Sequence, residues 1–304
     1  MLGGSPATSG LLAVLAQVVA MALALVVQDA EKSSAAPPDA KARGERLLKL
    51  HTEDAASYVL HRDPAKTEEL KLRREPIYRW TNPTRVGGQE GDVFVWTYRG
   101  RPEVVASIFS HPHNGGRERV LCHELHSLSR GVIVVERAAA KQWAPQAPGV
   151  DLEPIDAAPR PAATAPQRLV QIRALARDFS GRSLSDRGQV WPLRLLPRPL
   201  YRYESTDPAV IDGALFALVS SAGTDPEIIL VIEARETPDG PRWISGAARF
   251  SDMDLWLKHR DKEVWSSIRS AENTFEHDAK HRFRFYQDRI IPEVINDVPE
   301  SQAR

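Results

Sequence analysis

The stretch that decides the fold is Leu70–Phe109, which reads LKLRREPIYRWTNPTRVGGQEGDVFVWTYRGRPEVVASIF. A weaker copy occurs at Leu193–Ile232, which reads LRLLPRPLYRYESTDPAVIDGALFALVSSAGTDPEIILVI. Pro76, Tyr78, Arg79 and Trp80 align with Pro199, Tyr201, Arg202 and Tyr203, all at an offset of 123 residues. Gly91 and Phe94 align with Gly213 and Phe216 at nearly the same offset. This even spacing predicts an internal duplication.

Both copies contain the pattern of a β-hairpin. Residues 92–98 alternate between two sets of side chains, and residues 103–110 return as a β-branched strand after the turn Arg99-Gly100-Arg101-Pro102. Residues 214–219 and 227–234 do the same around Gly223-Thr224-Asp225-Pro226. Alternation on either side of a glycine-containing turn is typical of an antiparallel hairpin.

Each hairpin is preceded by a helical pattern and followed by further strand patterns. Apolar residues recur at helical spacing over residues 43–61 and again over 167–182, while 119–127, 132–136, 242–250 and 281–286 read as strands. One helix with about four antiparallel strands predicts an α+β class, the outline of cystatin-like and NTF2-like folds. The expected arrangement is a tandem duplication about a pseudo-two-fold axis, with a ligand groove between the copies.

The domain organisation follows from composition. Residues 1–28 contain Leu11–Val27, an apolar run of 17 residues that is longer than a usual signal-peptide core and near the lower limit for a membrane span. We expect a signal peptide or an N-terminal membrane anchor, then a polar linker over residues 29–42. Repeat 1 covers 43–150, a Pro/Ala-rich linker 151–166, repeat 2 167–292 and a tail 293–304.

Composition excludes some functional classes and leaves others open. The chain has 40 basic and 40 acidic side chains, so its zero net charge gives no general attraction to nucleic acid, and we expect membrane contact only through the N-terminal segment. Its single cysteine, Cys122, can form no intramolecular disulfide. No Gly-x-Ser-x-Gly elbow or phosphate-binding glycine loop is present, so no catalytic or nucleotide-binding residues are predicted.

Two sets of residues are candidate sites. Imidazole and carboxylate groups gather at His111, His113, Glu124 and His126, with Cys122 and His123 beside them, and such groups bind zinc or another transition metal. Side-chain alternation would put Cys122, Glu124 and His126 on one face of a strand and His123 on the other. The second set is the recurring Arg79, Trp80, Arg202 and Tyr203, which are candidates for lining the ligand groove. The alternative is that these residues have a structural role in ion pairs or ring stacking.

The fragments RWTNP, GDVFVWTYRGRPEVV, HELHSLS and DGALFALVSSAGTDPEIILVIEAR resemble a family of uncharacterised exported bacterial proteins with no assigned activity. The resemblance covers roughly residues 45–265. It implies an extracytoplasmic protein of the periplasm or cell envelope and no catalytic role. We therefore expect an exported or envelope-anchored protein that is a non-catalytic binding or structural module, without cofactor, whose partner is a small molecule or an envelope protein. The alternative is a metal-dependent hydrolase using the His/Glu cluster.

Overall fold

The computed structural model describes residues 40–84, 87–137, 143–146, 148–221, 223–269 and 280–293. By contact density the chain divides into units of residues 1–46 and 47–304. The predicted N-terminal signal or anchor, Leu11–Val27, lies outside the described residues, as does most of the 29–42 linker. In the part of the chain that is described, no helix has the length and apolarity needed to cross a membrane.

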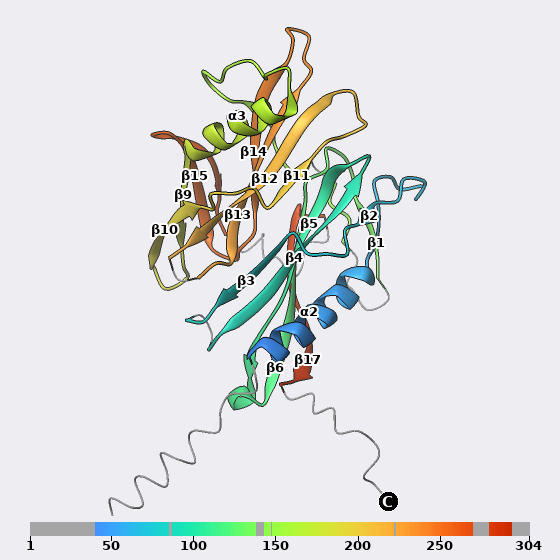
Figure 1. Cartoon of the computed structure of the whole chain (residues 1–304). Coiled ribbons are helices and arrows are strands. Elements are labelled where there is room, and N and C mark those ends of the chain that lie inside the picture. Colours follow the sequence, from blue (N-terminus) through green and yellow to red (C-terminus); the bar gives the residue numbers. More distant parts are fainter. Residues whose placement is uncertain are drawn as a thin grey trace, which may run out of the picture. The chain divides into compact units, whose positions relative to one another are not determined.

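Strands dominate the structure (Figure 1). Of the described residues 49% lie in strands and 13% in helices, and these helices are α2 (Ala40–Ala56) and α3 (Ala165–Arg177) with one 3-10 turn, η1 (Asn114–Gly116). The predicted α+β fold, a duplicated helix with about four strands in a cystatin-like or NTF2-like outline, is therefore wrong. The chain instead forms large, curled antiparallel sheets.

The first large sheet has six strands in the order β17-β6-β5-β4-β2, with β3 also paired to β4. Their bounds are β2 Lys71–Leu72, β3 Tyr78–Asn82, β4 Gln89–Tyr98, β5 Arg101–His113, β6 Glu118–Ser127 and β17 Phe283–Pro292. The predicted hairpin is confirmed as β4 and β5, which pair from Tyr98↔Arg101 to Glu90↔Ser110. A separate two-stranded sheet pairs β1 (Val59–His61) with β7 (Val134–Glu136).

The second large sheet has nine strands in the order β16-β15-β9-β10-β12-β13-β14-β8, with β11 also paired to β12. Their bounds are β8 Glu153–Pro154, β9 Phe179–Leu184, β10 Val190–Leu195, β11 Tyr201–Tyr203, β12 Val210–Ser220, β13 Pro226–Arg235, β14 Arg242–Arg249, β15 Asp254–His259 and β16 Lys262–Ser267. The second predicted hairpin is confirmed as β12 and β13. The pairings β12–β13 and β15–β16 contain register shifts, and β-bulges at such shifts increase the local twist of a sheet.

The strands β9, β10, β15 and β16 explain the wrong prediction of the fold class. Residues 179–182 were assigned to the end of a helix, but α3 ends at Arg177 and β9 begins at Phe179. The turn between β9 and β10 is closed by hydrogen bonds between Ser185 and Gln189, with Gly188 at a φ of 76° that favours glycine. These strands extend the second sheet well beyond the four predicted.

A local likeness between the two hairpins remains. On the first strand of each, a glycine lies opposite an aromatic residue of a short neighbouring strand: Gly91 opposite Trp80 and Gly213 opposite Tyr203. A Cβ on either glycine would lie 2.5 Å or 2.4 Å from that ring, so only glycine leaves room for it. The likeness stops there, because the surrounding sheets differ in strand number and order.

The two large sheets face each other across a shared core. Val93, Val105 and Phe109 of the six-stranded sheet belong to the same buried cluster as Leu215 and Val231 of the nine-stranded sheet. The outer face of the six-stranded sheet packs against Ala55 and Tyr58, at and just after the end of α2, and the other face of the nine-stranded sheet packs against α3. The space between the sheets is therefore reached by side chains from both.

Candidate functional site

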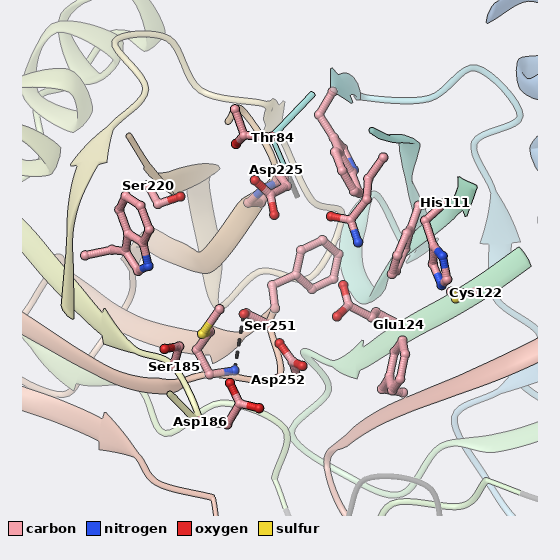
Figure 2. A pocket seen from close by; sticks show the side chains of 18 of the residues that line it. Thr84, His111, Cys122, Glu124, Ser185, Asp186, Ser220, Asp225, Ser251 and Asp252 are labelled. Carbon is pink, nitrogen blue, oxygen red and sulfur yellow. Dashed lines mark hydrogen bonds between the residues drawn. The ribbon is translucent and has the colours of Figure 1, made fainter. Parts of the chain in front are cut away.

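A pocket of about 810 Å³ lies between the two sheets (Figure 2). Aromatic, acidic and small polar side chains from both sheets form its wall. They include Trp80, Phe109, His111, Cys122, Glu124, Phe285 and Gln287 from the six-stranded sheet, and Asp186, Arg187, Gln189, Trp191, Ser220, Asp225, Phe250 and Asp252 on or beside strands of the nine-stranded sheet. The volume is within the usual range for small-molecule sites.

One wall of the pocket is aromatic. The ring of Trp80 lies 5.4 Å from that of Phe109, and the ring of Phe109 lies 6.3 Å from that of Phe285 in a stacked arrangement. Trp80 reaches this position by lying over Gly91, and its indole N–H donates to Ser107 Oγ at 3.1 Å. The three rings come from β3, β5 and β17, so they form a rigid apolar surface supported by the sheet.

Carboxylates face the same space (Figure 2). Glu124 on β6 and Asp225, just before β13, are 8% and 6% exposed, whereas Asp186 and Asp252 are exposed at the rim. Asn82 donates to Asp225 Oδ1 at 3.1 Å and helps to fix that carboxylate. Buried carboxylates attract cations more strongly than exposed ones because little water screens them.

A buried arginine lies behind this acidic wall. Arg249 donates to the carbonyl oxygens of Ser251 and Met253 and to Ser267 Oγ. Burial lowers the pKa of Arg249 to about 10, while the negative charges of Asp254, Asp252 and Glu124 oppose that shift. Arg249 therefore balances part of the charge of both Asp252 and Glu124 from behind the pocket.

The structure does not bring the predicted metal ligands together. His111 pairs with Val120, whereas His126 pairs with Val105 near the other end of β5. The side chains of β6 alternate as expected, because Cys122 lies in the core between the sheets while Leu121 and Leu125, on the same face as His123, lie in the outer cluster. Glu124 is four residues from Val120 along β6, which is about 13 Å at 3.3 Å per residue. His113 lies exposed at the end of β5. In the described part of the chain, the ligand atoms of these four residues form no group of three within 4.8 Å of one another.

Two of the predicted ligands are tied to their surroundings in other ways. His126 is 1% exposed, and its Nδ1 donates to the carbonyl oxygen of Ser127 at 2.7 Å. Burial lowers the pKa of His126 to about 3. His111 lines the pocket, and its Nδ1 lies 3.2 Å from the carbonyl oxygen of Pro112.

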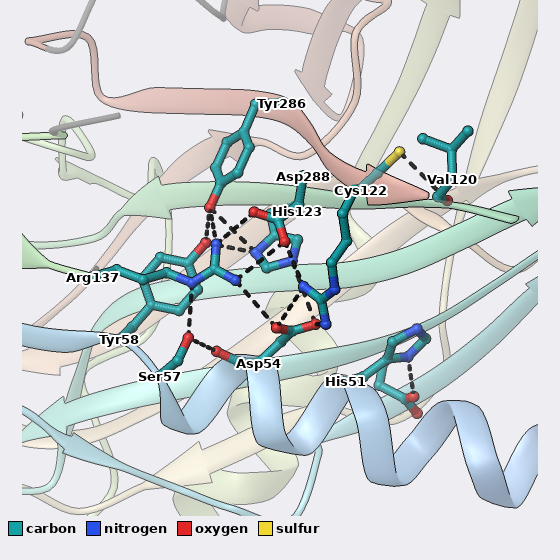
Figure 3. A network of polar contacts seen from close by, with 12 residues as sticks. His51, Asp54, Ser57, Tyr58, Val120, Cys122, His123, Arg137, Tyr286 and Asp288 are labelled. Carbon is teal, nitrogen blue, oxygen red and sulfur yellow. Dashed lines mark hydrogen bonds and ion pairs between the residues drawn. The ribbon is translucent and has the colours of Figure 1, made fainter. Parts of the chain in front are cut away.

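Among the described residues, the group that does meet metal-ligand spacing is Asp54 on α2 with His123 and Asp288 on the outer face of the six-stranded sheet (Figure 3). Arg137 donates to both aspartates, at 3.1 Å to Asp54 and 2.8 Å to Asp288, and Arg289 pairs with both as well. Two guanidinium groups thus already neutralise two carboxylates. A metal cation would have to displace them, so we assign the cluster to an ion-pair network that holds α2.

His123 is the neutral member of that network. Burial, together with the positive charge of Arg137, lowers the pKa of His123 to about 3. Its Nδ1 lies 2.6 Å from the hydroxyl of Tyr58, which in turn contacts the hydroxyl of Tyr286. Burial also raises the pKa of Tyr58 well above its usual value, so the hydroxyl stays protonated and can donate.

Of the four residues predicted for a groove, only Trp80 lines the pocket. Arg79 pairs through Nε with Asp92 at 2.9 Å, and Arg202 pairs with Asp212 at 2.7 Å. The Tyr203 hydroxyl donates to Glu233 Oε1 at 2.6 Å. The ion pairs favour the structural interpretation of the two arginines.

Glu233 is part of a buried bridge between the two sheets. Arg101 on β5 donates to Glu233 on β13 at 2.8 Å, with side chains 5% and 0% exposed. Burial acts to lower the pKa of Arg101, but the charges of Glu233 and Glu103 outweigh it and the net shift is upward. This bridge fixes the separation of the sheets at one side of their shared core.

Sequence reasoning missed most of the pocket. None of Trp191, Phe250, Phe285, Asp186 and Asp252 stands out in the sequence as a candidate site residue, and Asp225 is part of the predicted hairpin turn. The only available signal was the location of the three aspartates in or beside turns that flank strands. That signal is common to most β proteins and does not mark a pocket.

Comparison of the chain with protein-family models, with curated proteins and with solved structures gave no match. The functional assignment therefore depends on the geometry and chemistry of the pocket. Those are a pocket of ligand size, an aromatic wall and a set of carboxylates.

Proposed function

We propose that the protein is a non-catalytic binding module that holds a small organic molecule in the pocket between its two large sheets. The observation that carries this proposal is the pocket of about 810 Å³ with aromatic side chains contributed by both sheets. Burying a ligand against such rings is favourable, at roughly 25 cal/mol per Å² of apolar surface. The side chains that face the pocket can contact a ligand through the faces of their aromatic rings and through their carboxylates.

The rigidity of the wall supports binding. The rings of Trp80, Phe109 and Phe285 are carried by paired strands, and the Arg101–Glu233 bridge fixes the sheets that enclose the space. A preformed site loses little conformational freedom when a ligand binds, so more of the contact energy becomes affinity.

The test is a ligand-observed NMR screen of the full chain with a panel of small aromatic molecules that are neutral, cationic or anionic. The deciding variant is Trp191→Ala, because Trp191 is half-buried and lines the pocket. The matched control is Trp256→Ala, since Trp256 is half-buried in the same sheet but packs on Arg182 outside the pocket. We expect binding that Trp191→Ala weakens at least tenfold and Trp256→Ala leaves unchanged. Absence of any binding, or equal loss in both variants, would refute the proposal.

We further propose that this binding occurs outside the cytoplasm. The support is the apolar run Leu11–Val27 followed by a polar linker, together with the resemblance to exported proteins. Expression of the full chain in a bacterium, followed by fractionation and mass measurement, tests it. A periplasmic product shortened near residue 28 indicates a signal peptide, and a full-length envelope product indicates an anchor. A full-length product in the cytoplasm would contradict the proposal.

A further inference from the structure

We infer that the ligand of the inter-sheet pocket is an organic cation, a positively charged nitrogen carried on an apolar or aromatic body. This inference rests on the proposed function and names the chemical class of its ligand. It draws on the charge of the wall, the type of its apolar surface and the spacing of its carboxylates.

The charge of the pocket wall is negative. Among the residues that the structure describes, Glu124, Asp186, Asp225 and Asp252 line it, and Arg187 is the only lysine or arginine that does so. Arg187 is exposed at the rim beside Asp186, and Arg249 offsets part of the charge of Asp252 and Glu124 from behind. Four carboxylates in the described wall therefore outnumber these two arginines, which leaves an excess of negative charge. The chain as a whole has no net charge, so the excess is a property of this pocket.

The apolar surface of the pocket is of the kind that attracts cations. Trp80, Phe109 and Phe285 form a continuous aromatic wall, and Trp191 and Phe250 come from the opposite sheet. The face of an aromatic ring is electronegative, so an ammonium group within about 6 Å of a ring centre is attracted to it. An aliphatic lining would bury an apolar ligand equally well but would give no preference for charge.

The spacing of the carboxylates excludes the simplest cation, a bare metal ion. Among the described residues, no three His, Cys, Asp or Glu side chains from the pocket wall place ligand atoms within 4.8 Å of one another. The carboxylates come from β6 and from three separate turns at strand ends, distributed around a space of about 810 Å³. Such an arrangement surrounds a body of several atoms, so the positive charge must be part of a larger organic molecule.

A pair of probes of the same shape tests the inference on the full chain. Phenyltrimethylammonium and tert-butylbenzene differ in one atom, nitrogen or carbon, and so in charge but hardly in size. We expect the cation to bind at least tenfold more tightly, and we expect Asp252→Asn, alone and with Asp186→Asn, to reduce this preference by a factor of three or more. Both aspartates are exposed, so these variants preserve the core. Glu263→Gln, at an exposed position of β16 outside the pocket, is the matched control and should leave the preference unchanged.

The outcomes separate this inference from the proposed function. If tert-butylbenzene or anionic members of the panel bind as tightly as the cation, and Trp191→Ala weakens that binding, the pocket is a ligand site but the inference is wrong. If the cation is preferred and Glu263→Gln reduces the preference as much as Asp252→Asn does, the preference comes from overall charge and the inference is again wrong. If no member of the panel binds, the proposed function itself fails.

Discussion

Acidification from pH 7 to pH 5 should destabilise this protein through two buried histidines. Burial lowers the pKa values of His123 and His126 to about 3, so both rings are neutral in the folded chain at pH 5. In the unfolded chain, a histidine with a pKa of about 6.5 binds a proton at that pH. The contribution that these two buried neutral histidines make to the free energy of unfolding is therefore complete above about pH 6.5 and is lost as the pH falls toward 3.

The size of the effect follows from the same values. Each pH unit below the unfolded pKa costs about 1.36 kcal/mol, so at pH 5 each histidine has lost about 2 kcal/mol of stabilisation. Together, His123 and His126 should lower the free energy of unfolding by about 4 kcal/mol between pH 7 and pH 5. This loss of about 4 kcal/mol depends little on the exact pKa values of the two histidines in the folded protein, provided that those values lie well below 5.

The assay is urea unfolding at pH 7 and pH 5 for the wild type and for His126→Gln. The variant should lose about 2 kcal/mol less than the wild type over this interval, because only His123 still contributes. His113→Gln, at the exposed end of β5, is the matched control and should keep the wild-type pH dependence. An unchanged pH dependence in His126→Gln would refute the reasoning, because it would mean that His126 is already protonated in the folded protein.

Two further predictions concern packing and charge. Gly91→Ala should destabilise the protein by about 1–3 kcal/mol, because the new Cβ would lie 2.5 Å from the Trp80 ring, while Gly131→Ala, with open space around its Cα, should be nearly neutral in the same unfolding assay. Glu233→Gln should cost about 3–5 kcal/mol because it leaves buried Arg101 with Glu103 alone and removes the carboxylate that pairs with Arg235. Changing Arg101 and Glu233 together to Met should cost less than the single change. A double variant less stable than Glu233→Gln would contradict the second prediction.

Local features of the fold could be predicted from the sequence. The two hairpins were predictable because the chain alternates on either side of turns such as Arg99-Gly100, and such turns act over a few residues. The alternation of Cys122, Glu124 and His126 on one face of β6 was predictable for the same reason. Both depend on interactions between residues that are near each other in the chain.

The size of the nine-stranded sheet could not be predicted in this way. The strand β9 reads FSGRSL and continues directly from α3, so neither apolar content nor a gap marks its start. Its identity as a strand comes from its neighbours β10 and β15, and β15 lies about 75 residues away along the chain. Long-range pairing of this kind overrides local preference.

The residues of the candidate metal site are separated for a related reason. Four histidines within a short stretch suggested a metal centre, but residues close in sequence on paired strands are spread along the strands by about 3.3 Å per residue. The pocket, in contrast, joins Trp80 to Trp191 and Phe285, which only the packing of one sheet on the other brings to a single space.

The position of β17 has a consequence for how the chain is synthesised. This strand, Phe283–Pro292, is the last described element, yet it pairs with β6 and supplies Tyr286 and Asp288 to the network beneath α2 and Phe285 to the pocket. The six-stranded sheet therefore stays incomplete, with the edge of β6 open, until residues 283–292 have also left the ribosome. An open edge invites pairing with other chains, so a nascent chain needs protection by chaperones, or by export in an unfolded state, during that interval.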